Sequence, residues 1–270
     1  MPAPIRNARS IAAVALLAAL LPGCVSHYRT PGGPAPIGEM TAPSIAEKLA
    51  ARPECPIPAT LALVRVQDGG YWSRSVAGVR RGGVSIVSAD DLELPEDAQD
   101  LAKWADVRAF VRLSAILVPS SERADGPAAA MLALREGAAS LHADVLALYT
   151  IDTTFRVDDF SPGALGLLTL GLAPTKSAVV NATASMAFID VRTGFVHGTA
   201  EASARDDQAA NSWTSADAVD QCRRRVEREA LAKLLDEAEK CWAAIAAARR
   251  ADLAQAPPGP PSVAGASGQE

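Results

Sequence analysis

The side chains best suited to chemistry are few in this chain and widely spaced. His27, His142 and His197 are the only histidines among 270 residues. No two of them have metal-ligand spacing and no C-x-x-C occurs, so we predict no metal site and no cofactor. The sequence also contains no G-x-S-x-G, phosphate-binding loop or H-E-x-x-H motif. We therefore predict a protein that is not an enzyme, although a pairing of His142 or His197 with a serine stays open.

Four cysteines are present, and only some of them can pair. Cys222 and Cys241 lie on one expected helix, 241 − 222 = 19 residues apart, which is about 28 Å at about 1.5 Å per residue. A disulfide needs Cα atoms within about 7 Å, so these two cannot bond to each other. We expect a disulfide from Cys55 to Cys241 or, as second choice, to Cys222; three small buried thiols are the alternative.

The fourth cysteine, Cys24, ends an N-terminal segment with the features of a targeting signal. Arg6 and Arg9 precede an apolar run of 11 residues, IAAVALLAALL, which fits a signal-peptide core of about 7–15 residues. A membrane-spanning helix needs about 20 apolar residues, so this run is too short to remain as a span.

The residues Leu21-Pro22-Gly23-Cys24 resemble the lipobox of bacterial lipoproteins. The resemblance implies that residues 1–23 are a signal peptide that is removed. It also implies that Cys24 is lipidated, with palmitate among its acyl chains. Val25, which is not Asp, implies sorting to the outer membrane, with the domain facing the periplasm. An ordinary secretory signal with a chance cysteine is the alternative.

Composition and charge exclude one large class of function. Apolar residues make up 49% of the chain and charged residues 21%, which is a globular composition. The formal charge is −5, and loss of Arg6 and Arg9 would make it −5 − 2 = −7. An acidic chain has no basic excess to hold a phosphate backbone, so we expect no nucleic-acid partner.

Proline spacing and hydrophobic periodicity divide the mature chain into three parts. Residues 24–58 are rich in proline and predict an extended, lipidated tether, with one short helix near Ile45 and Leu49. Residues 59–249 predict a single domain, and residues 250–270, rich in Ala, Pro, Gly and Ser, predict a disordered tail.

The expected elements of the domain define an α/β or α+β fold. We predict strands at 61–66, 84–87, 107–118 and 144–154, and helices at 95–104 and 127–141. Alternation over residues 179–204 predicts an antiparallel hairpin that turns at Gly194, with Val196 on the apolar side and His197 on the wet side. Apolar residues at helical spacing from Val219 to Ile245 predict a long helix packed on a mixed sheet, with Arg223, Arg224 and Glu227 off its apolar stripe.

One apolar segment lies where a polar loop is expected. Residues 160–173 read FSPGALGLLTLGLA and fall between two predicted strands. Either the segment packs on the core, or it contacts a membrane or a protein partner. The residues for the second interpretation are the leucines Leu165, Leu167, Leu168, Leu170 and Leu172.

The order of the elements resembles that of envelope lipoproteins. Ala143-Asp144-Val145-Leu146 and the turn Asp190-Val191-Arg192-Thr193-Gly194 are similar to motifs of the curli-secretion (CsgG-like) and penicillin-binding-protein-activator lipoproteins. In the curli family the corresponding segments, here 155–178, become membrane hairpins. We therefore hypothesise a non-enzymatic outer-membrane lipoprotein, an adaptor or assembly factor with an unknown envelope protein partner. The alternatives are a homo-oligomeric secretion or transport subunit, and a periplasmic hydrolase or small-ligand binder.

Overall fold

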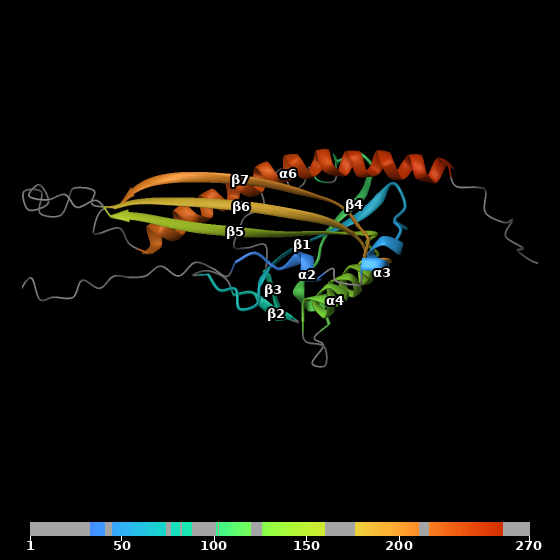
Figure 1. Cartoon of the computed structure of the whole chain (residues 1–270), viewed down its shortest axis with the longest axis horizontal. Helices are drawn as coiled ribbons and strands as arrows, with labels where there is room; N and C mark the ends of the chain where they lie inside the picture. Colours follow the sequence, from blue (N-terminus) through green and yellow to red (C-terminus); the bar gives the residue numbers. More distant parts are fainter. Residues whose placement is uncertain are drawn as a thin grey trace, which may run out of the picture.

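An apolar strand, β1 (Ala59–Asp68), lies inside the sheet because almost every side chain on both of its faces is buried. The computed structural model describes residues 33–40, 45–73, 77–81, 83–87, 101, 103–119, 126–159, 176–210 and 216–255. These residues form a seven-stranded mixed sheet in the order β2-β3-β1-β5-β6-β7, with β4 also paired to β1 (Figure 1). The predicted fold class is confirmed.

The predicted strands and helices recur with altered ends. Strand β4 stops after six residues because Ser114 caps a short 3₁₀ helix, η3, in place of the second half of the predicted strand. The predicted helix at 95–104 falls mainly outside the described residues. The element bounds are β2 Val79–Arg81, β3 Val84–Val87, β4 Val107–Arg112, η3 Ala115–Leu117, α4 Pro127–Ser140, β5 Val145–Asp159, β6 Lys176–Asp190, β7 Val196–Ala210 and α6 Ala216–Gln255.

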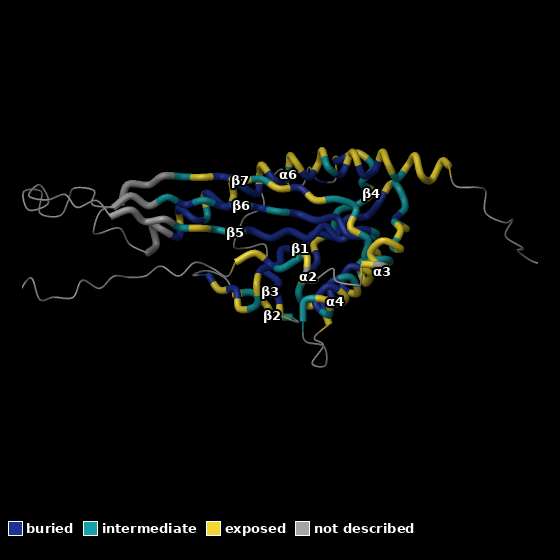
Figure 2. The backbone as a smooth tube through the Cα atoms, viewed as in Figure 1, coloured by how far each residue is buried: buried dark blue, intermediate teal, exposed yellow. Residues whose placement is uncertain are grey.

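Two hydrophobic cores lie on opposite faces of the sheet. The odd-numbered β1 residues Leu61 and Leu63 face helix α6, and the even-numbered residues Ala62, Val64 and Val66 face helix α4. On the α6 side, the rings of Phe188 and Trp242 lie 5.7 Å apart. Figure 2 shows the central strands of the sheet as buried and the outer face of α6 as exposed. A strand covered on both faces explains the continuous apolar run of β1.

The hairpin of β6 and β7 confirms the sequence prediction, with one correction. Its turn places Gly194 at a φ of +73°, which glycine adopts without strain. A β-bulge follows, because Phe188 pairs with Gly198 and Ile189 pairs with Val196, which leaves His197 as the extra residue. The bulge reverses the predicted sides: the His197 side chain is only 4% exposed, whereas Val196 is 38% exposed.

The N-terminal segment differs from the predicted tether. Residue 33 already joins the fold, since the Asp68 N–H donates to the Gly33 carbonyl at 3.1 Å. The Ala35 N–H donates to Thr150 Oγ1 at 2.9 Å, and α2 (Ile37–Met40) contacts α4. Proline removes donors only at its own positions, so the amides between the prolines still bond to the sheet. The predicted domain boundary at residue 59 therefore lies inside the described fold.

Two further differences concern helices. The short predicted helix forms as α3 (Ile45–Ala50), but Ile45 is 79% and Leu49 72% exposed, so its apolar face packs on nothing described. Helix α6 continues to Gln255, past the predicted end of the domain at residue 249. Among the described helices, none combines the length and the apolar character needed to cross a membrane.

Candidate functional site

The structure brings Cys55, Asp190 and His197 together from three distant parts of the chain. Cys55 precedes β1, Asp190 ends β6 and His197 is the bulged residue of β7. Cys55 Sγ lies 3.5 Å from His197 Nε2, and Asp190 Oδ2 lies 3.8 Å from the same nitrogen. Sequence reasoning missed this cluster because the bulge that turns His197 inward has no signature in the residues themselves.

Asp190 is the most heavily bonded side chain of the cluster. Its Oδ2 accepts the backbone N–H groups of Glu54 at 2.7 Å and Cys55 at 2.8 Å. Its Oδ1 accepts those of Arg192 at 2.9 Å and Thr193 at 3.0 Å. Burial alone would raise the pKa of Asp190, but the contact with His197 and these backbone bonds outweigh it and lower the pKa well below its usual range.

The Cys55 thiol is poorly suited to nucleophilic chemistry. Burial, the charge of Asp190 and, more weakly, Asp144 raise its pKa to about 11, although Arg249 opposes the shift. A thiol with so high a pKa is protonated at neutral pH, whereas a nucleophilic cysteine needs the thiolate. Cys55 and Asp190 also approach the same nitrogen of His197, so the histidine cannot relay a proton between them as a triad does.

The cluster has the donor types of a zinc site, with three ligand atoms all within 4.8 Å of one another. Both Asp190 oxygens are already occupied by two N–H donors each, so the protein itself satisfies the carboxylate. The arrangement best fits a structural role: Asp190 holds residues 54–55 against the β6–β7 turn by hydrogen bonds, and we call this contact the Asp190 lock.

The predicted disulfide is not formed in the structure. Cys55, Cys222 and Cys241 are free thiols. Cys55 contacts His197, Cys222 lies beside Asp206, and Cys241 approaches the Thr199 carbonyl at 3.6 Å. The alternative stated from the sequence, three buried thiols, holds for Cys55 and Cys222, whereas Cys241 is half-buried.

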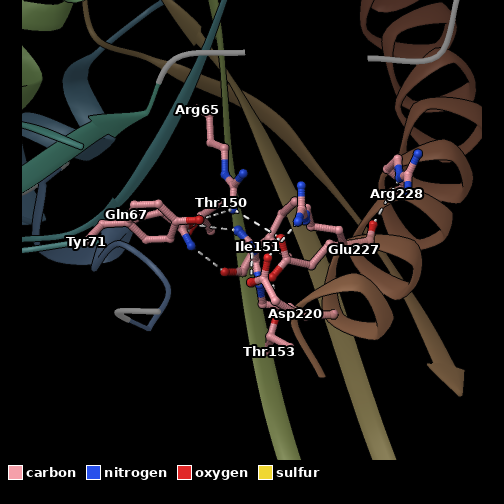
Figure 3. A network of polar contacts seen from close by, with 11 residues as sticks. Arg65, Gln67, Tyr71, Thr150, Ile151, Thr153, Asp220, Glu227 and Arg228 are labelled. Carbon is pink, nitrogen blue, oxygen red and sulfur yellow. Dashed lines mark hydrogen bonds and ion pairs between the residues drawn. The ribbon is translucent and has the colours of Figure 1, made fainter. Parts of the chain in front are cut away.

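A second polar cluster lies between β1 and α6 (Figure 3). Glu227 Oε2 lies 2.8 Å from Arg223 Nη1 and 3.5 Å from Arg65 Nη2. Thr153 Oγ1 donates to Glu227 Oε1 at 2.8 Å, and Arg223 also contacts Asp220 at 3.0 Å. Arg65, Asp220, Arg223 and Glu227 are each at most 3% exposed.

This cluster corrects the prediction that Arg223 and Glu227 lie off the buried stripe of the helix. Glu227 meets Arg65, which lies on the α6-facing side of β1, and Arg223 is buried beside Glu227 as its second partner. A charged side chain within a buried apolar strand requires partners of opposite charge. Arg65 inside the run LALVRV was therefore the one sequence signal that could have revealed the cluster.

The Arg65 guanidinium also contacts an aromatic ring. Its Cζ lies 5.2 Å from the centroid of the Tyr71 ring, and Nη2 lies 3.4 Å from the Tyr71 hydroxyl. Nearby, the Gln67 amide bonds to both the N–H and the carbonyl of Ile151, which extends the pairing of β1 with β5 by a side chain.

The other predicted site residues are not brought into either cluster. His142 follows the C-cap of α4 and has a φ of +53°. Cys24, His27 and residues 160–173, with the five leucines named above, lie outside the described residues.

No family model and no curated protein matches this sequence. Among solved structures, protein XCC0632 from Xanthomonas campestris, assigned to family-model DUF330, is 10% identical with a TM-score of 0.33. That likeness covers 75% of this chain and 93% of that protein. A dodecamer of a PelC variant from Paraburkholderia phytofirmans is 13% identical with a TM-score of 0.24, covering 66% and 91%. These values are too low for either likeness to bear on function.

Proposed function

We propose that the chain is a lipid-anchored outer-membrane protein that faces the periplasm and acts as a non-enzymatic adaptor or assembly factor. The lipobox-like residues that end at Cys24 support the anchor. Three acyl chains at that cysteine would give stable membrane attachment, because one chain alone binds only weakly.

The position at which the chain joins the fold supports close attachment. Gly33 already bonds to β1, and 33 − 24 = 9 Cα steps separate it from Cys24. At about 3.3–3.6 Å per step, these residues span at most about 30 Å. In an anchored chain, the point at which Gly33 joins β1 would therefore stay within about 30 Å of the bilayer.

One observation carries the adaptor role: among the described strands, none pairs with one edge of part of β5. Strand β1 pairs with β5 only from Val145 to Leu148. Further along β5, the backbone N–H and carbonyl of Ile151 bond to the side-chain amide of Gln67. From residue 152 to 159, β5 pairs with β6 on one side, and no described strand pairs with its other side. An open strand edge offers N–H and carbonyl groups to a strand of another protein.

The test is photo-crosslinking in cells. A photo-reactive amino acid replaces Thr154, which is exposed on β5, or Glu239, an exposed residue of helix α6 that lies on no strand edge and serves as the matched control. We expect one discrete crosslinked partner from position 154 and none from position 239, and we expect Cys24→Ala to abolish the crosslink. Equal crosslinking at both positions, or an unchanged product with Cys24→Ala, would contradict the proposal.

A second candidate, an oligomeric secretion or transport subunit, rests on the long arm formed by β5, β6 and β7. Each of these strands has 15 residues, and the pair Asp159–Lys176 ends the arm where the apolar segment 160–173 begins. Size-exclusion chromatography distinguishes the candidates, because a large ring favours the second and a monomer favours the first.

A further inference from the structure

The sheet is split at one point along β1. Strand β4 pairs with β1 in parallel up to Leu63, and β3 pairs with the same edge in the antiparallel sense from Arg65 onward. The carboxyl ends of β3 and β4 therefore meet at Val64, where both strands end. A point at which neighbouring strands diverge leaves a crevice, and such crevices are common binding sites in α/β proteins.

A pocket of about 370 Å³ lies at this split. Its apolar wall includes Val64, Val79, Ile86 and Leu113. The charged residues of its described lining are Arg65 and Arg112, with no carboxylate among them, and Tyr149 also lines it. The pocket thus combines an apolar wall with two cationic groups and a phenol.

Two of these polar groups are available to a ligand. Tyr149 is only 2% exposed, and within the described chain its hydroxyl has no hydrogen-bond partner. Arg112 is exposed at the end of β4 and likewise makes no hydrogen bond or ion pair to a described residue. The Tyr149 side chain is buried as a whole, but its hydroxyl oxygen is not sealed from solvent, so an acceptor bound in the pocket can reach it.

Arg65 is fixed in place behind these groups. Glu227 contacts its Nη2 at 3.5 Å, and the Tyr71 ring lies under its Cζ. These contacts hold the guanidinium against the pocket without closing it, since Arg65 still contributes to the lining. A guanidinium already ordered by its neighbours loses little rotamer freedom when an anion binds.

We propose that this pocket binds an oxyanion carried on an apolar chain, either a carboxylate or a phosphate ester. Arg112 and Tyr149 would donate to the oxyanion from two sides, with the charge of Arg65 behind it. The chain would lie on the wall of Val64, Val79, Ile86 and Leu113. At about 30 Å³ per water-sized group, the pocket holds about a dozen non-hydrogen atoms, which is the size of octanoate or hexyl phosphate.

Calorimetric titration of the full-length mature chain in a neutral maltoside detergent tests this inference. The probes are octanoate and hexyl phosphate, with octanol as the neutral chain and acetate and inorganic phosphate as the head groups alone. We expect at least one anionic probe to bind with a Kd of about 1 mM or tighter. Octanol and the head groups should bind at least about tenfold more weakly, and the tighter of the two anions identifies the head group.

Variants assign the binding to this pocket. Arg112→Gln should weaken the anion at least about tenfold and Tyr149→Phe about threefold, because each removes one donor. Arg80→Gln removes an exposed arginine of β2 that does not line the pocket, and it should bind as the wild type does. No anion binding, equal binding of octanol, or equal affinity in Arg112→Gln and Arg80→Gln would overturn the proposal. None of these results depends on Cys24 or on a protein partner.

Discussion

Replacement of Asp190 by Asn should loosen residues 54–55 from the β6–β7 turn. The side chain is fully buried and accepts four backbone N–H groups, two from residues 54–55 and two from the β6–β7 turn. Asn keeps the size of Asp but has one acceptor oxygen, and its NH₂ group would face two N–H donors. Only one of the two pairs of bonds can therefore survive.

The expected cost follows from the two bonds that are lost. A hydrogen bond to a charged acceptor contributes about 1.5–3 kcal/mol, so two of them contribute about 3–6 kcal/mol. The free energy of unfolding of a globular domain is about 5–15 kcal/mol, so Asp190→Asn should remove a large share of the stability. Asp144→Asn is the graded control, because Asp144 accepts only one N–H, that of Thr60 at 2.9 Å, and should cost about 1–3 kcal/mol.

The stability difference between wild type and Asp190→Asn should also depend on pH. The pKa of Asp190 is lowered in the folded protein from its ordinary value of 3.8, so the folded state binds fewer protons than the unfolded state. Its contribution is complete above the unfolded value and is lost as pH falls toward the folded one. The difference should shrink by about 1 kcal/mol between pH 5 and pH 3.

The assay combines urea unfolding with hydrogen exchange and thiol labelling. We expect faster exchange at the Glu54 and Cys55 amides and faster modification of the Cys55 thiol, which is 1% exposed in the wild type. An Asp190→Asn protein with the stability of Asp144→Asn, and with Cys55 still protected, would refute the assignment of Asp190 as the lock.

Three other substitutions probe separate parts of the fold. Glu227→Gln removes the carboxylate that Arg65 and Arg223 share, although Arg223 keeps Asp220, and should cost about 3–5 kcal/mol in urea unfolding; a loss below about 1 kcal/mol would contradict a stabilising network. Gly69→Ala places a Cβ 2.5 Å from the Gly83 carbonyl oxygen and should cost about 1–3 kcal/mol, whereas Gly33→Ala meets nothing within 4 Å and should be neutral in thermal unfolding. Serine at two leucines of residues 160–173 should leave the circular dichroism spectrum intact if the segment meets a membrane or partner, and collapse of the spectrum would place it in the core.

Local patterns predicted most of the architecture. Alternation along residues 179–204 and the glycine at 194 specified the hairpin, and the helical spacing from Val219 to Ile245 specified the apolar part of the face that α6 buries, but not its charged residues Arg223 and Glu227. These features are periodic, so they are visible without knowledge of the fold. The pairing of β1 with two strands on one edge has no such periodicity, because it depends on segments brought together from distant parts of the chain.

The candidate sites were harder to predict because they depend on long-range contacts. The inward turn of His197 results from one extra residue in the register of β7, and a shift of one residue moves a side chain to the other face. In the sequence, Arg223 and Glu227 resemble an ion pair on the solvent-exposed side of a helix. Only the fold reveals that Arg65 of β1 lies close enough to contact Glu227. The pocket at Val64 arises from the divergence of β3 and β4, which neither strand sequence encodes alone.

The central claim, that Cys24 carries the membrane anchor, is tested most directly by the intact mass of the mature chain purified from the membrane fraction. The account predicts a chain of 270 − 23 = 247 residues that begins at Cys24 and carries a diacylglyceryl thioether and an amide-linked acyl group. It also predicts that Cys24→Ala leaves the membrane fraction while the matched Cys241→Ala stays in it. An unmodified Cys24 in the mature chain, or membrane association that survives in Cys24→Ala, would contradict the account.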